Sequence, residues 1–122
     1  MNPTQSYRDL IVWQRAIEMV VEIYALTDKF PKEEIFGVTS QMRRAAVSIP
    51  SNIAEGRFRG TKADYLNFLR TAYASGAELE TQIEISKRLP KTKTLDYSRA
   101  DKLLDEVMRM LNAMIRNFNP KS

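Results

Sequence analysis

The residues most suited to chemistry lie in one short basic segment that contains an aromatic residue, namely Arg57, Phe58, Arg59 and Lys62. Arginine and lysine bind phosphates, and an exposed ring beside them can stack on a base of a single-stranded nucleic acid. The alternative is a solvated turn between helices whose Phe58 packs on the protein. That alternative is the commoner origin of so short a basic run.

Upstream of this segment, Arg43 and Arg44 could add positive charge to the same phosphate-binding surface. Polar residues around them fall on one side of a predicted helix, and these are Gln41, Arg44, Ser48, Ser51, Asn52 and Glu55. Solvent-facing sides carry more Lys and Glu than Ser and Asn, which favours a subunit contact over a ligand site or a water-facing side. We therefore predict a subunit interface that includes Gln41, Ser48, Ser51 and Asn52.

Three carboxylates, Glu78, Glu80 and Glu84, form an acidic series in the next predicted helix. Glu80 and Glu84 are one turn apart and could hold a cation or act as an acid and base pair. An ordinary surface ion pair of Glu84 with Lys87 or Arg88 is favoured, because no nucleophile or histidine accompanies the carboxylates.

The chain contains no histidine and no cysteine, which excludes the common metal and nucleophilic sites. Structural zinc sites use Cys and His, Ser and Cys triads need His as the base, and di-iron bundles need Glu-x-x-His motifs. A disulfide framework is excluded in the same way. We predict a protein that is not an enzyme and that carries neither a metal nor a cofactor.

Length and composition indicate a single globular domain. The chain has 122 residues, of which 43% are hydrophobic and 28% charged, and its formal net charge is +4. This mild positive charge permits binding to nucleic acid without requiring it. No apolar run is long enough to span a bilayer, and the first residues lack the layout of a signal peptide. We expect a cytoplasmic protein with one domain over residues 1–122, ordered over about 7–118 and frayed at 119–122.

Apolar residues recur at helical spacing in four segments, residues 9–29, 32–57, 61–88 and 94–118. Asp9 and Thr61 are the expected N-caps of the first and third helices. Short loops between long helices predict an all-α fold, an antiparallel up-down-up-down four-helix bundle. Pro50 lies inside the second segment, so this helix is expected to be kinked or broken near Pro50.

The first predicted helix has an unusually wide apolar side, which covers roughly 220° of its circumference. A bundle core covers less than this, and the excess would form a large exposed apolar patch. Closed assembly hides such a patch on every subunit, so we predict a homo-oligomer. Its interface is expected to include Val12, Met19, Ile23 and Leu26.

Gly76 and three tyrosines occupy apolar positions of the predicted helices. Glycine weakens a helix, so its place among small residues favours close approach of another helix over a flexible point. Tyr24, Tyr65 and Tyr73 are expected to pack in the core with one bonded hydroxyl each.

Three segments carry a resemblance to a known family: residues 7–14 (YRDLIVWQ), 30–34 (FPKEE) and 41–56 (QMRRAAVSIPSNIAEG). Together they resemble the four-helix-bundle proteins encoded in intervening sequences of bacterial 23S rRNA genes. The resemblance implies assembly as a homopentamer. The chain is also similar to accessory bundle proteins of diversity-generating retroelements, which pair with a reverse transcriptase and bind nucleic acid.

These observations predict a non-enzymatic oligomeric bundle that binds nucleic acid, with RNA favoured over DNA, and that has no membrane role. The family setting suggests this function, and the basic residues allow it. The alternative is a protein-binding adaptor or scaffold with no nucleic-acid role. The two differ in whether the basic residues converge on one surface after assembly.

Overall fold

The computed structural model describes residues 6–118, apart from the side chain of Phe36, and this part of the chain is helical without any strand. Four long helices form the molecule: α1 (Ile11–Thr27), α2 (Ser40–Arg59), α3 (Lys62–Arg88) and α4 (Ser98–Phe118). Three short helical turns accompany them: η1 (Tyr7–Asp9), η2 (Lys32–Glu34) and η3 (Ile35–Thr39). The predicted all-α fold is confirmed, whereas the prediction for residues 119–122 lies outside the described residues.

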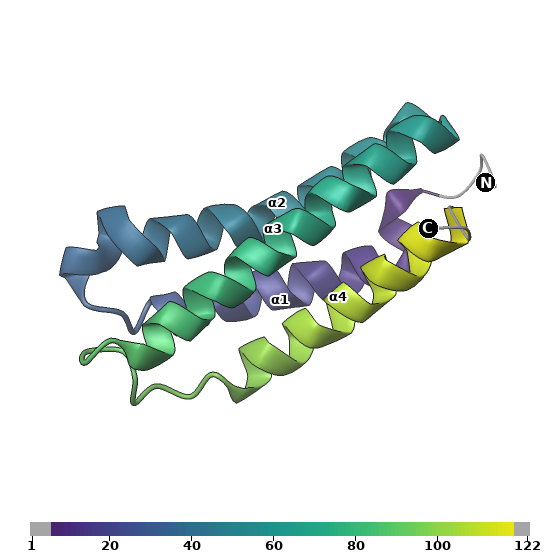
Figure 1. Ribbon diagram of the computed structural model, residues 1–122. Coiled ribbons are helices and arrows are strands. Elements are labelled where there is room, and N and C mark those ends of the chain that lie inside the picture. Colours follow the sequence, from purple (N-terminus) through teal and green to yellow (C-terminus); the bar gives the residue numbers. More distant parts are fainter. Residues whose placement is uncertain (1–5, 119–122) are drawn as a thin grey trace.

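Each helix packs on the next in sequence, and α4 returns to α1, so the four helices enclose one core (Figure 1). Fully buried side chains from all four helices fill this core, among them Met19, Ile49, Leu69 and Leu111. Burial of this apolar surface is the main source of stability for the bundle. No helix within residues 6–118 combines the length and hydropathy needed to cross a bilayer.

Helices α1 and α4 begin later than the sequence predicts, because local polar side chains organise the residues before them. Ser6 accepts a hydrogen bond from the backbone N–H of Arg8 and starts η1, so α1 begins at Ile11 rather than Asp9. Before α4, the carboxylate of Asp96 accepts hydrogen bonds from the N–H and the hydroxyl of Ser98 at 2.9 and 2.6 Å. That helix therefore begins at Ser98 rather than near residue 94.

The helix that contains Pro50 does not break there. α2 runs as one helix through this buried proline, and in Figure 1 its second half rises beside α3 while its first half lies flatter, as a bend near Pro50 would produce. The side-chain amide of Asn52 donates to the carbonyl of Ser48 at 2.7 Å and supports this turn. The actual interruption is at Gly37 (φ −111°, ψ −119°), which separates the predicted start near residue 32 from α2.

Close helix packing at Gly76 is confirmed. A Cβ atom at this position would lie 2.1 Å from the sulfur of Met108 on α4. A second contact of this kind joins α2 to α3, where a Cβ on Gly56 would lie 2.6 Å from Cβ of Phe68. Glycine at both positions lets neighbouring helices approach more closely than any larger residue would allow.

The prediction of a subunit interface at Val12, Met19, Ile23 and Leu26 is wrong. These residues are at most 4% exposed, because the core of their own chain covers them, and no surface remains for a second subunit. The excess apolar surface of α1 lies elsewhere on the helix. Ile17, Val21 and Tyr24 are 37%, 64% and 41% exposed.

The three tyrosines expected in the core differ in position. Tyr65 is buried, but its hydroxyl has no hydrogen-bond partner within the described part of the chain. Tyr24 and Tyr73 are exposed, so the expectation of core packing is wrong for both. Both residues lie at the edge of the apolar side of their helices, where a helical wheel does not separate core positions from surface positions.

Candidate functional site

The basic turn, residues 57–62, joins α2 to α3 at one end of the bundle. Gly60 adopts a left-handed conformation (φ 85°), which glycine tolerates and which ends α2 directly after Arg59. The hydroxyl of Thr61 accepts a hydrogen bond from the N–H of Asp64 at 3.1 Å and caps α3. The turn is therefore tight, and its side chains stand on two rigid helix ends.

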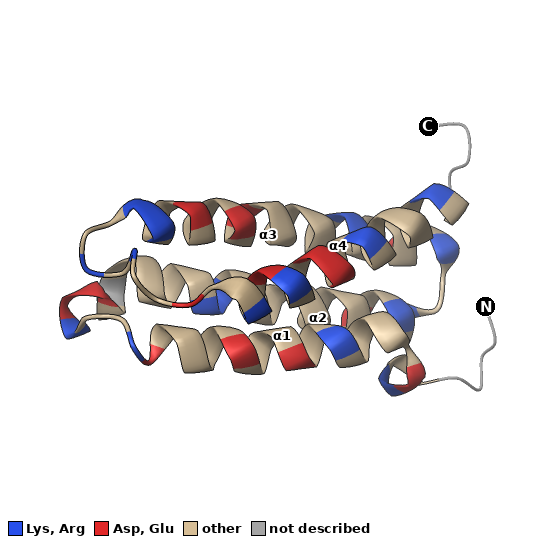
Figure 2. Cartoon of the chain, turned by 90° about the horizontal axis from the view of Figure 1, so that it is seen from below, with Lys and Arg blue, Asp and Glu red and all other residues tan. Residues whose placement is uncertain are grey.

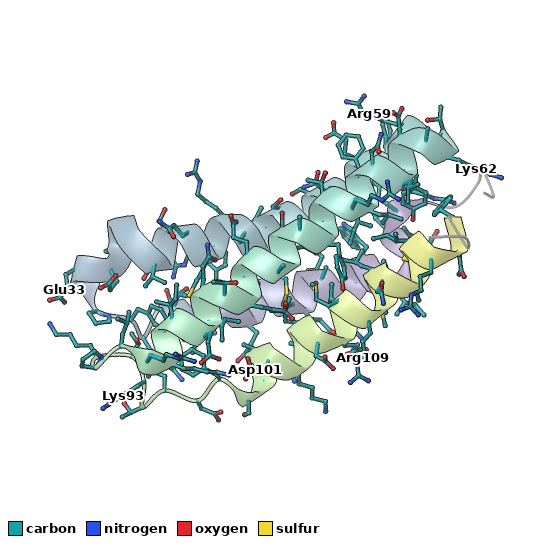
Figure 3. The ribbon with its side chains drawn as sticks, viewed as in Figure 1. Glu33, Arg59, Lys62, Lys93, Asp101 and Arg109 are labelled. Carbon is teal, nitrogen blue, oxygen red and sulfur yellow. The ribbon has the colours of Figure 1, made fainter. Side chains whose placement is uncertain are left out.

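Phe58 projects from this turn with 85% of its surface exposed. The expectation that Phe58 packs on the bundle is wrong, because so exposed a ring makes little contact with the described residues. Figure 3 shows Arg59 and Lys62 at the same end of the molecule, far from Glu33 and Lys93. An exposed ring beside cations is the arrangement that stacks on bases while it holds phosphates.

The arginines beside Phe58 are held by neighbouring side chains. Arg59 donates to the carboxylate of Glu55 at 3.1 Å, and its guanidinium lies 5.0 Å from the ring centre of Phe68. Arg57 lies 5.9 Å from the ring centre of Tyr65, and burial raises the pKa of this phenol. Lys62 is exposed. The pair with Glu55 leaves the Arg59 guanidinium with further donors, since it has five N–H groups.

A shallow hollow of about 600 Å³ lies beside Phe58. Its lining comes from η1 and α2 and consists of Tyr7, Ser51, Ala54, Glu55, Phe58 and Arg59. Tyr7 is fixed by an edge-to-face contact with Trp13 at 5.4 Å between ring centres. Ser51 therefore faces the side of α2 that carries Phe58, rather than the side that meets α3.

A second hollow of about 280 Å³ continues along the groove between α1 and α2, lined in part by Trp13, Ile17 and Val47. Apolar side chains near it are partly exposed, with Val21 at 64% and Val47 at 40%. We call Ile17, Val21, Tyr24 and Val47 the apolar face. It is the exposed remainder of the wide apolar side predicted for the first helix.

Arg43 and Arg44 do not join the basic turn. Arg43 donates to the hydroxyl of Thr27 and to the carboxylate of Asp28, each at 2.8 Å, and its guanidinium lies 4.5 Å from the ring centre of Tyr24. It ties α2 to the end of α1. Arg44 lines a separate groove between α2 and α3, about 20 Å from Arg57 along the helix at 1.5 Å per residue.

The polar residues of α2 do not all face the same neighbouring element. Gln41 and Ser48 face α3 of the same chain, where Ser48 shares a 2.8 Å hydrogen bond with Ser75. Asn52 donates to the Ser48 hydroxyl at 2.9 Å. The prediction of an interface at these positions missed this contact within the chain, although Ser75 and the buried Gln82 signal it from the sequence of α3.

The acidic series on α3 forms an ordinary surface pair, as favoured above. Arg88 donates to Glu84 at 3.0 Å. No group of three or more acidic side chains suited to a metal occurs among residues 6–118. Acidic residues alternate with basic ones along α1, α3 and α4 (Figure 2), so within residues 6–118 the basic residues of these helices are interspersed with acidic ones, and the basic turn is a local cluster.

Comparison with known proteins identifies one family. A search of curated proteins found no match. The family model described as 23S rRNA-intervening sequence protein matches residues 8–113, which include η1 and most of the four-helix bundle. The chain therefore belongs to the 23S rRNA-intervening sequence protein family.

Proposed function

We propose that this chain is a non-enzymatic, cytoplasmic protein that assembles into a closed homopentamer and binds single-stranded RNA through its basic turns. One observation carries the proposal. Phe58 is 85% exposed between two arginines at the end of a rigid helix. A large apolar ring in water is unfavourable unless a partner covers it, and a nucleobase matches both its flat surface and the nearby positive charge.

Assembly would raise the affinity of so small a site. One basic turn offers only a few cations to phosphates, which gives weak binding at physiological salt. Repetition of the turn around a ring makes each further contact at high effective concentration. The apolar face supports assembly, because Ile17, Val21, Tyr24 and Val47 expose apolar surface that a second subunit would cover. The number of subunits rests on the family resemblance alone.

The family setting favours RNA over DNA as the ligand. The resemblance to accessory bundle proteins of diversity-generating retroelements adds a second link to nucleic acid. An adaptor role for the same protein is supported by the apolar face, which would suit a protein partner as well as another subunit. The experiment below decides between these functions.

The test is RNA binding by the assembled protein, measured by fluorescence anisotropy of a labelled single strand over a range of salt concentrations. The logarithm of affinity should fall linearly with the logarithm of salt, with a slope near −0.7 per phosphate neutralised. Replacement of Arg57, Arg59 and Lys62 by Ala should weaken binding and flatten the slope.

The control is a variant of equal charge change at the opposite end of the bundle, with Lys29, Lys32 and Lys93 replaced by Ala. These lysines are exposed, so the control should keep most of the affinity. Equal loss in both variants would assign binding to net charge rather than to the basic turn. Absence of RNA binding by the parent at low salt would favour the adaptor function.

A further inference from the structure

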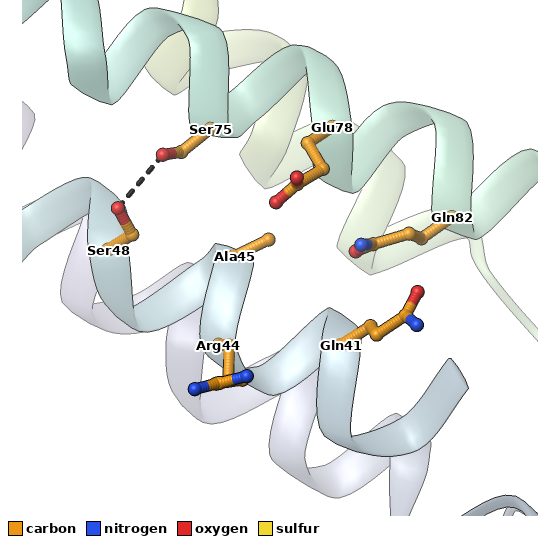
Figure 4. A pocket seen from close by; sticks show the side chains of 7 residues that line it. All are labelled: Gln41, Arg44, Ala45, Ser48, Ser75, Glu78 and Gln82. Atoms are coloured by element: carbon orange, nitrogen blue, oxygen red, sulfur yellow. Dashed lines mark hydrogen bonds between the residues drawn. The ribbon is translucent and has the colours of Figure 1, made fainter. Parts of the chain in front are cut away.

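A polar groove between α2 and α3 is separate from the basic turn and from the apolar face. Its volume is about 490 Å³, and Figure 4 shows the residues that line it: Gln41, Arg44, Ala45, Ser48, Ser75, Glu78 and Gln82. A groove of this size is within the range that encloses small ligands. Most of its lining can donate or accept hydrogen bonds, which is unusual where two helices of one bundle meet.

The lining of the groove contains an amide whose oxygen has no partner within the described part of the chain. Gln82 is 7% exposed, and its side chain points from α3 toward α2 (Figure 4). Its oxygen is enclosed, and no hydrogen-bond donor within residues 6–118 reaches it. Buried polar atoms are almost always hydrogen-bonded in folded proteins, so each exception needs an explanation. A turn of the amide about its last bond would present this oxygen to a donor in the groove.

Two unpaired charges of opposite sign border the same space. Glu78 projects from α3 toward α2, and Arg44 comes from α2 (Figure 4). Neither side chain makes an ion pair or hydrogen bond within the part of the chain that the structure describes. The carboxylate of Glu78 disfavours a phosphate here, so the groove is not an extension of an RNA surface.

We propose that this groove binds a free α-amino acid with an amide side chain. The ammonium group of the ligand would donate to the carboxylate of Glu78 and to the amide oxygen of Gln82. Its carboxylate would accept from the guanidinium of Arg44, a pair that is often bidentate. Its side-chain amide would lie near Gln41, whose amide both donates and accepts.

The test is isothermal titration calorimetry of the assembled full chain with L-glutamine as the probe. We expect saturable binding with a dissociation constant below about 1 mM. L-Glutaminamide lacks the carboxylate and N-acetyl-L-glutamine lacks the ammonium, so both should bind at least about 10-fold more weakly. Absence of binding by L-glutamine, or equal binding by all three compounds, would overturn the proposal.

Variants locate the ligand on the chain. Glu78→Gln and Arg44→Gln should each weaken L-glutamine binding by about 10-fold or more, because each removes one charged partner. Glu80→Gln is the matched control, since Glu80 lies on the outer side of α3 and lines a different hollow. Equal affinity in Glu78→Gln and Glu80→Gln would overturn the assignment to this groove.

Gln82→Met separates a ligand contact from a structural role. Methionine has a similar volume and lacks the amide, so the variant should stay helical by circular dichroism while it loses L-glutamine binding. Unchanged affinity would overturn the role of Gln82. RNA binding by the basic turn is measured independently and should stay unchanged in all these variants.

Discussion

The two ends of the bundle differ in how their side chains are used. The loop end holds the α1–α2 and α3–α4 connections, residues 28–39 and 89–97, and several of its polar groups bond to one another. The turn end holds the basic turn, the start of α1 and the end of α4 (Figure 1), and it leaves Phe58 exposed.

At the loop end, hydrogen bonds stabilise the α3–α4 connection, and an ion pair joins it to the α1–α2 connection. Thr92 is 1% exposed and donates to the carbonyl of Ser86 at 2.7 Å, while the hydroxyl of Tyr97 donates to the carbonyl of Thr92 at 2.9 Å. Lys91 pairs with Glu33 at 2.9 Å and links the two connections. Polar residues at the loop end therefore stabilise the two connections, whereas the turn end also presents Phe58, an exposed side chain that the fold does not need.

The largest difference is expected from aromatic truncation at each end. Tyr97→Ala should lower the free energy of unfolding by roughly 3–5 kcal/mol, because the ring is buried and its loss leaves a cavity. Phe58→Ala should change stability by less than about 0.5 kcal/mol, since the ring is exposed. Urea denaturation of both variants measures this, and comparable destabilisation would contradict the distinction between the two ends.

A smaller difference is expected from a matched pair of threonines. Thr92→Val removes a buried donor and leaves the carbonyl of Ser86 without it, which should cost about 1–3 kcal/mol. Thr61→Ala removes the exposed N-cap of α3 and should cost about 1 kcal/mol. Thermal unfolding of the two variants sharpens the comparison. A greater loss in Thr61→Ala would place the more important hydrogen bond at the turn end.

The smallest expected effect is the pH dependence of stability that comes from the exposed ion pair of Glu33 and Lys91 at the loop end. The hydrogen bond from Lys91 lowers the pKa of Glu33 below its ordinary value of 4.5, and the same bond raises the pKa of Lys91 above 10.5. Because the pKa of Glu33 is depressed, its contribution is present above pH 4.5 and is lost as pH falls through the folded-state pKa. The contribution of Lys91 is lost as pH rises through its own raised pKa.

The melting temperature of Glu33→Gln should therefore lie slightly below that of the parent at neutral pH and should meet it in acid. Thermal unfolding scans from neutral to acidic pH measure this difference. A constant difference at every pH would show that the ion pair does not cause it.

Helix number, fold class and the close approach at Gly76 could be predicted from the sequence, because they follow from apolar spacing and from a glycine within a core stripe. The start of α3 at its N-cap Thr61 could be predicted as well. The start of α1 could not, since a single contact of Ser6 with the N–H of Arg8 decides it. Of the two alternatives expected near Pro50, a kink or a break, the break does not occur, because α2 continues through the proline.

The site was only partly predictable. A helical wheel assigns an apolar side but does not say which part of it the chain covers, so the interface predicted at Val12 and Met19 is wrong. A helical wheel also does not show tertiary contacts. Arg43 pairs with Asp28 and therefore does not join the basic turn. Exposure of Phe58 depends on where α2 ends relative to the bundle, and this is a property of the fold.

The most direct test of the central claim is ultraviolet crosslinking of the assembled protein to a uridine-rich single-stranded RNA, followed by mass spectrometry of the peptides. We expect crosslinked nucleotides to map to the turn end, on the peptide that contains Phe58, and we expect Phe58→Ala to remove them. Crosslinks confined to the loop end around Lys91 and Lys93, or their complete absence at low salt, would contradict it.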